Sequence, residues 1–178
     1  DFNRPDACWT VADLSRVYPA AETAKRGLWL EKYTGALLVR DELTLKGQTE
    51  LYWFLHTAAD IQLSRDKKSA VLTAADAGGT PRRLWVGILQ GTGSFSVMDA
   101  VPLSSSPNPD LWPENQSNAG DAVNPQKQNP NAGIRKLAVH LEAAQGELTQ
   151  AVYLTLLEEG AELPQALPET VKPLAEWQ

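Results

Sequence analysis

The stretch that most constrains the fold is an apolar run at residues 50–60, rich in aromatic and branched side chains. It is too short for a helix that buries both faces, so it predicts a strand, which we expect at the centre of a sheet. Because side chains alternate along a strand, its two faces differ. One face carries Leu51, Trp53, Leu55 and Thr57, and the other carries Tyr52, Phe54 and His56. The first face suits a sandwich core, and the second suits another layer or a binding surface.

Further short runs with strand character follow along the chain. They lie at residues 8–14, 25–33, 36–43, 69–73, 83–89, 134–142 and 148–157. Turn signals such as Thr34-Gly35 and Gln145-Gly146 separate them, and we expect hairpins at both places. The composition of 148–157 also suits a short helix, but the tight turn before it favours a strand. This spacing predicts an all-β fold, a two-layer antiparallel β-sandwich.

At 178 residues the chain suits a single domain spanning 1–178. Prolines alternate with asparagines across residues 102–133, which predicts a long irregular loop there, either functional or disordered. Three prolines after Gly160 predict an irregular C-terminal strap, and Trp177 indicates that the strap packs on the body. We also expect any open sheet edge to be covered by the loop, the strap or a second copy of the chain.

Charge and composition exclude several function classes. With 16 basic and 22 acidic residues and no long basic cluster, nucleic acid is not an expected partner. No apolar run approaches the length of a membrane span, so we expect no membrane partner. Cys8 is the single cysteine, which rules out an internal disulfide and a cysteine-based zinc site. The N-terminus has neither Met nor a signal peptide, so we interpret the chain as processed or cut from a longer protein.

Four segments, in this order and spacing, resemble the C-terminal β-sandwich of heparinase II/III-like polysaccharide lyases. They are WTVADL at 9–14 with Tyr18-Pro19, KRGLWL at 25–30, LVRDEL at 38–43 and YWFLHT at 52–57. The similarity covers about the first half of the chain, and residues 137–157 show a weaker similarity to the same family. It implies a bacterial, periplasmic or secreted enzyme that cleaves uronic-acid glycans such as glycosaminoglycans by β-elimination.

The resemblance also implies which parts of such an enzyme are missing from this sequence. In the family an N-terminal helical toroid carries the catalytic Tyr and one His, and histidine motifs early in the sandwich supply further histidines and the ligands of a structural divalent metal. This chain contains two histidines, His56 and His140, and neither motif. We therefore expect no catalytic residue, no metal ligand and no cofactor here, and no lyase activity from this polypeptide alone. The implied partners are the toroid and an acidic polysaccharide.

Three residues are candidates for contact with a glycan. His56, on the polar face of the 50–60 strand, can bind a glycan carboxylate or support the active site; the alternative is a hydrogen-bonded histidine of the sandwich. Trp112, in the long loop, can stack on a sugar ring or pin the loop to the body. Arg83, next to Arg82, can pair with uronate or sulfate groups, or simply be a solvated side chain at a sheet edge.

The sequence therefore supports two functional hypotheses from different classes. The first is a non-catalytic sandwich that supports a uronate-glycan cleft formed with an upstream toroid. The second is a free-standing carbohydrate-binding sandwich whose exposed aromatic residues and long loop form the ligand surface. A plain structural or assembly module is a third reading. Fold-level analogy does not choose among them.

Overall fold

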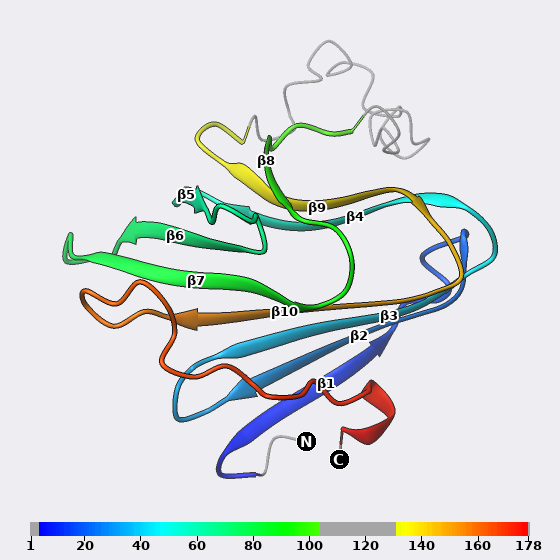
Figure 1. Cartoon of the computed structure of the whole chain (residues 1–178), viewed down its shortest axis with the longest axis horizontal. Helices are drawn as coiled ribbons and strands as arrows, with labels where there is room; N and C mark the ends of the chain where they lie inside the picture. Colours follow the sequence, from blue (N-terminus) through cyan, green and yellow to red (C-terminus); the bar gives the residue numbers. More distant parts are fainter. Residues whose placement is uncertain (1–3, 104–130, 178) are drawn as a thin grey trace, which may run out of the picture.

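The chain folds into two antiparallel β-sheets packed face to face, an all-β sandwich, as Figure 1 shows for the computed structural model. The structure describes residues 4–103 and 131–177. The predicted fold class is confirmed. Most of the expected loop at 102–133, including Trp112, lies outside the described residues.

A seven-stranded sheet forms the larger layer, with strand order β1-β2-β3-β10-β7-β6-β5. Its strands are β1 (Ala7–Asp13), β2 (Ala21–Glu31), β3 (Leu37–Leu45), β5 (Asp60–Leu63), β6 (Ser69–Ala75), β7 (Pro81–Gln90) and β10 (Glu147–Leu156). The predicted hairpin of 25–33 with 36–43 is confirmed, since Arg26 pairs with Asp41 and Leu28 with Val39. Residues 148–157 form a strand rather than a helix, as expected.

A three-stranded sheet with the order β4-β9-β8 forms the smaller layer. Its strands are β4 (Thr49–Thr57), β8 (Phe95–Asp99) and β9 (Arg135–Ala144). The expected strand at 50–60 is present, but it is an edge strand and not a central one, so that prediction was wrong. The expected hairpin of 134–142 with 148–157 was also wrong, because β9 and β10 belong to different sheets. The turn at Gln145-Gly146 carries the chain from one layer to the other.

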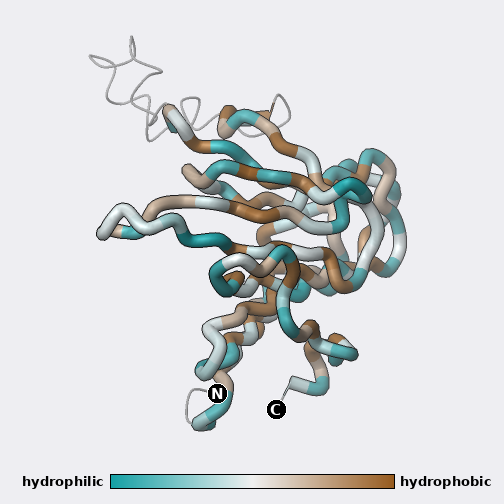
Figure 2. Tube along the Cα trace, turned by 60° about the vertical axis from the view of Figure 1, so that its left-hand side comes forward, coloured by the Kyte–Doolittle hydropathy of each residue, from teal (hydrophilic) through white to brown (hydrophobic). Residues whose placement is uncertain are grey.

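The main core lies between the two layers. Trp53, Phe95, Leu137 and Val139 project from the small sheet, and residues such as Val86 and Val152 meet them from the large sheet. The alternation along β4 places Trp53 and Leu55 inward, as the sequence predicted. Figure 2 shows apolar segments along the facing strands and more hydrophilic segments at the tip of the β6–β7 hairpin.

The C-terminal strap crosses the outer face of the large sheet, as the orange-to-red trace of Figure 1 shows. Leu174, in the short 3-10 helix η4 (Leu174–Glu176), packs over Gly27, where a Cβ atom would overlap its side chain. The backbone N–H of Leu174 donates to Glu42 Oε1 at 2.9 Å, and Trp177 meets the Trp29 ring edge-on at 5.5 Å. The prediction that the strap packs is therefore confirmed.

One long edge of the small sheet has no strand partner among the described residues. β4 pairs with β9 on one side, and the other side of its nine residues pairs with no strand within 4–103 and 131–177. The strap does not cover this edge, because it lies on the large sheet. Coverage by the 102–133 loop or a second copy stays a prediction.

Candidate functional site

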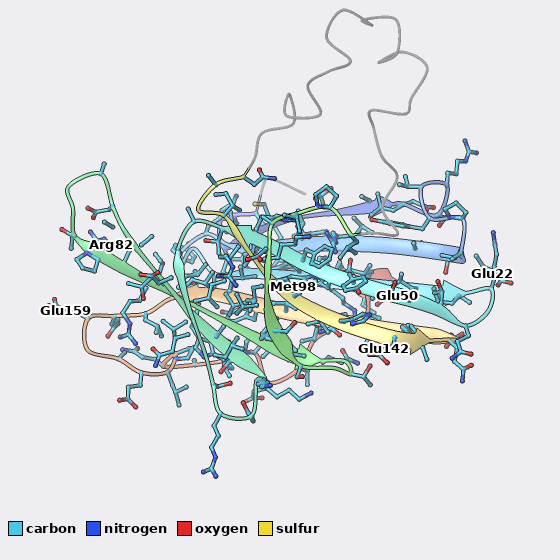
Figure 3. The ribbon with its side chains drawn as sticks, turned by 90° about the horizontal axis from the view of Figure 1, so that it is seen from above. Glu22, Glu50, Arg82, Met98, Glu142 and Glu159 are labelled. Atoms are coloured by element: carbon cyan, nitrogen blue, oxygen red, sulfur yellow. The ribbon has the colours of Figure 1, made fainter. Side chains whose placement is uncertain are left out.

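The outer face of the small sheet gathers aromatic, imidazole, carboxylate and amine groups, and we call it the β4–β9 face. It consists of Glu50, Tyr52, Phe54 and His56 on β4 with Lys136 and His140 on β9. Since Trp53 and Leu55 face the core, their neighbours along β4 must face outward. The register then sets Tyr52 opposite His140 and His56 opposite Lys136. Figure 3 looks down on this layer, with Glu50, Glu142 and Met98 labelled.

Glu50 joins the two strands at one end of this face. Its Oε1 accepts a hydrogen bond from the Tyr52 hydroxyl at 2.9 Å and lies 2.9 Å from His140 Nε2. An ionised carboxylate only accepts, so the imidazole nitrogen is the donor in the second contact. The Tyr52 and His140 rings stack with centroids 4.1 Å apart and planes 3° apart. The three side chains form one connected group that is half open to solvent.

Aromatic contacts continue from Tyr52 along β4. The Phe54 ring stacks beside Tyr52 at 5.1 Å, and His56 meets Phe54 edge-on at 6.0 Å. Lys136 Nζ lies 4.7 Å from the centre of the Phe54 ring and donates to the Val101 carbonyl at 2.6 Å. Lys136 is only 4% exposed, so its ammonium group is held by these contacts and not by water. The rings thus form one continuous row of contacts on the outer side of the small sheet.

The raised pKa of Tyr52 favours a role as a hydrogen-bond donor over a role as a base that abstracts a proton. Partial desolvation, followed by the hydrogen bond to Glu50, raises the pKa of Tyr52. The phenol therefore stays protonated at neutral pH and acts as a donor and a stacking surface. This arrangement suits a binding platform, in which one aromatic face and several hydrogen-bonding groups meet a ligand together.

The structure describes two of the three predicted site residues, His56 and Arg83, and places them in separate regions. His56 is exposed at one end of the β4–β9 face. Arg83 lies on β7, on the outer face of the large sheet, and its Nη1 donates to the Ala161 carbonyl in the strap at 2.6 Å. Trp112 lies outside the described residues. His56 and Arg83 are thus on opposite outer faces of the sandwich and do not form one site.

Sequence reasoning missed most of the β4–β9 face. It singled out His56 and gave no role to His140, which is stacked on Tyr52 and half-buried. Alternation along β4 did place Tyr52 beside His56 on the same face. The pairing of β4 with β9 brings His140 to Glu50 across 90 residues, and no spacing rule foretells such a contact.

Within residues 4–103 and 131–177, no group of three or more His, Cys, Asp or Glu side chains is arranged to hold a metal ion. In the same part of the chain, no helix has the length and apolar character needed to cross a membrane.

Comparison with known proteins gives a likeness in fold. No protein-family model and no curated protein matches the chain. Among solved structures it is similar to a heparinase III gene product with methylated lysines, with a TM-score of 0.57 and 8% sequence identity. The match covers 89% of this chain and 21% of that one, so the chain spans about a fifth of its structural relative. At this identity the similarity shows a heparinase-like sandwich fold.

Proposed function

We propose that this chain is the C-terminal β-sandwich portion of a heparinase II/III-like polysaccharide lyase, where it supports a uronate-glycan cleft and performs no catalysis alone. The observation that carries the proposal is the fold match, which takes in nearly all of this chain and a minor part of a heparinase III. The order of four sequence segments gives the same indication independently. The partner under this proposal is an upstream helical toroid, and the setting is periplasmic or secreted.

The β4–β9 face is the surface that we assign to the glycan. Its aromatic side chains offer apolar surface to a sugar, and Tyr52, His140 and Glu50 offer hydrogen-bonding groups beside it. The Lys136 ammonium group lies against the Phe54 ring, so one positive charge accompanies the rings despite the net charge of -6. His56, exposed at the end of this face, is the group that we propose to hydrogen-bond a uronate carboxylate.

A free-standing carbohydrate-binding module is the second candidate function. The same platform favours it, because exposed rings on one sandwich face can hold a glycan without any second domain. The two candidates differ in what the isolated chain does. A binding module binds glycan by itself. A domain that only supports the cleft of a lyase binds glycan tightly only together with the rest of that lyase.

Calorimetric titration with sulfated and unsulfated uronic-acid polysaccharides tests both candidates. It is run at low and at physiological salt, and absorbance is followed for unsaturated product. If the chain is the cleft-supporting domain of a lyase, we expect weak, salt-sensitive binding without product. Tight saturable binding without product supports the free-standing module. Product formed by this chain alone would contradict the absence of catalysis. Absence of binding at both salt concentrations would remove the glycan role and leave a structural module.

A further inference from the structure

Among the described residues, the edge of β4 that points away from β9 is the longest sheet edge of the sandwich. The outermost strands of the two sheets are β1, β5, β4 and β8, which have seven, four, nine and five residues. From Leu51 to Thr57 the register of β4 with β9 is regular, and this stretch contains no proline, no lysine and no inward-facing charge. Proteins commonly protect an edge strand with such residues, so β4 is open to pairing with a further strand.

The residue order of β4 suits pairing with a second copy of itself. The strand reads Thr-Glu-Leu-Tyr-Trp-Phe-Leu-His-Thr, which is close to a palindrome about Trp53. When two copies pair antiparallel with Trp53 opposite Trp53, each residue meets one of matching chemistry. Thr–Thr and aromatic pairs of this kind stabilise antiparallel sheets. The pairs, each present twice, are Thr49 with Thr57, Glu50 with His56, Leu51 with Leu55 and Tyr52 with Phe54.

The alternation of side chains along β4 restricts the register of such a pair. A slip by one residue would turn the outward face of one strand inward, so the two-fold axis must lie at a residue and not between two residues. An axis at Tyr52 sets Glu50 against Phe54, and an axis at Phe54 sets Glu50 beyond the end of the facing strand. The axis at Trp53 pairs Glu50 with His56 and uses all nine residues of β4.

Glu50 and His56 are both able to form this cross-strand pair. Both side chains are exposed, at opposite ends of β4. Glu50 Oε1 contacts Tyr52 and His140, whereas Glu50 Oε2 has no hydrogen-bond partner within residues 4–103 and 131–177. An imidazole N–H can donate to this second oxygen, and the other imidazole nitrogen stays available to a glycan.

The large sheet presents an apolar surface that a strand added beside β4 would cover. Ala24 on β2 packs in one cluster with Leu51, and Leu28 and Leu30 continue the same face of β2. Ala24 is 2% exposed, whereas Leu28 is 39% and Leu30 is 38% exposed. The two layers therefore separate along this side, and Figure 1 shows β1 and β2 diverging from β4. A second copy paired with β4 would extend the small layer over these leucines.

We propose that this chain forms a symmetric dimer through antiparallel pairing of β4 with β4 of a second copy, centred on Trp53. The two three-stranded sheets then form one continuous layer of six strands. Because the two-fold axis is perpendicular to this layer, both β4–β9 faces point to the same side. The dimer does not require the lyase assignment, but it would present the proposed glycan surface twice on one face of the assembly.

Sedimentation equilibrium of the whole chain, from micromolar to millimolar concentration, tests the dimer. The parent is expected to associate as a dimer and no further. His56→Glu sets two carboxylates against each other across the strands, and Glu50→Lys sets an ammonium group against His56. Each variant should weaken the dimer by at least about tenfold.

Mixing the two variants tests the register. An equimolar mixture of His56→Glu and Glu50→Lys again places a carboxylate opposite a nitrogen group at both positions, so it should form a heterodimer with about the affinity of the parent. Gln62→Glu changes the net charge by the same amount as His56→Glu, at an exposed position of the edge strand β5. It is the matched control and should dimerise as the parent does.

Three results would overturn the dimer. They are a parent that stays monomeric at every concentration, an affinity that His56→Glu leaves unchanged, and a mixture of variants that associates no better than either variant alone. Amide exchange of the parent is a second measurement, which requires no variant to fold. Protection of the β4 amides that point away from β9 should rise with protein concentration. Protection that is independent of concentration would mean that the edge is covered within one chain, which also contradicts the proposal.

Discussion

Tyr52 on β4 and His140 on β9 lie directly opposite each other, with their rings stacked 4.1 Å apart and nearly parallel. Both also contact the same oxygen of Glu50. This relationship joins the edge strand to the middle strand of the small sheet through side chains as well as through backbone hydrogen bonds. It is the structural centre of the face that we assign to a glycan.

The Tyr52–His140 stack should appear as a coupling energy. Such a pair contributes about 0.5–1.5 kcal/mol beyond the area that it buries. We therefore expect the destabilisation of the Tyr52→Ala, His140→Ala double variant to fall short of the sum of the single variants by about 1 kcal/mol in urea unfolding. Tyr33, 81% exposed, provides the control, and its alanine variant should be additive with His140→Ala. Additivity in the first cycle would show that the stack contributes nothing.

A side chain at Gly27 should displace the C-terminal strap from β2. A Cβ atom there overlaps the side chains of Leu174 and Trp177, whereas one at Gly47 meets nothing within 4 Å. Gly27→Ala should therefore lower the free energy of unfolding by about 1–3 kcal/mol, and Gly47→Ala should have little effect. Urea unfolding and amide exchange of residues 171–177 measure the two effects. Unchanged stability and exchange in Gly27→Ala would mean that the strap is not packed on β2.

Two Arg–Asp pairs in this chain differ in burial and should differ in their effect on stability. Arg26→Ala leaves the Asp41 carboxylate without its partner in the sandwich interior, and we expect a loss of about 1–3 kcal/mol. Arg82→Ala breaks an exposed pair with Asp76, and we expect a loss below about 1 kcal/mol. Chemical denaturation at neutral pH compares the two variants. Equal losses would contradict the interior placement of Asp41.

Tyr153 should make the fold sensitive to alkaline pH. Burial raises its pKa to about 12, with the nearby Glu31 carboxylate adding to the effect. Above pH 10 the unfolded chain releases the phenol proton while the folded chain keeps it, so the free energy of unfolding falls between about pH 10 and 12. The stability lost should be about 1–2 kcal/mol.

Tyr153→Phe isolates this contribution, because it removes the proton and retains the ring. The variant should lose less stability than the parent between pH 9 and 11 in urea unfolding. Tyr33→Phe, at an exposed turn, should follow the parent curve. Identical curves for the parent and Tyr153→Phe would contradict a raised pKa for Tyr153.

The positions of most strands could be predicted because their cause is local. Alternating side chains and turn residues mark β1, β2, β3 and β7 in the sequence, and the hairpin of β2 with β3 follows from a short turn at Thr34-Gly35. The same alternation sends neighbouring side chains of a strand to opposite faces. The separate ion pairs of Asp41 with Arg26 and of Glu42 with Arg40 follow from it.

Strand partners could not be predicted in the same way, because they depend on the assembled core. Gln145-Gly146 has the chemistry of a hairpin turn, yet it joins β9 and β10 across the two layers. In both arrangements each strand buries one face, so the sequence pattern is the same. The strand at 50–60 also looked central because of its aromatic content, although it is an edge strand on which Trp53 faces the core and the Tyr52 and Phe54 rings face outward. The candidate site could not be predicted, because it requires the pairing of β4 with β9.

The most direct test of the account is the affinity of heparan sulfate for the parent chain, Tyr52→Ala and Tyr33→Ala, measured by calorimetry at low salt. We expect Tyr52→Ala to weaken binding by at least about fivefold, because the sugar loses an apolar contact surface and a hydrogen-bonding group, and Tyr33→Ala to bind as the parent does. Equal affinity of all three proteins, or no binding by the parent, would contradict the assignment of the β4–β9 face to the glycan.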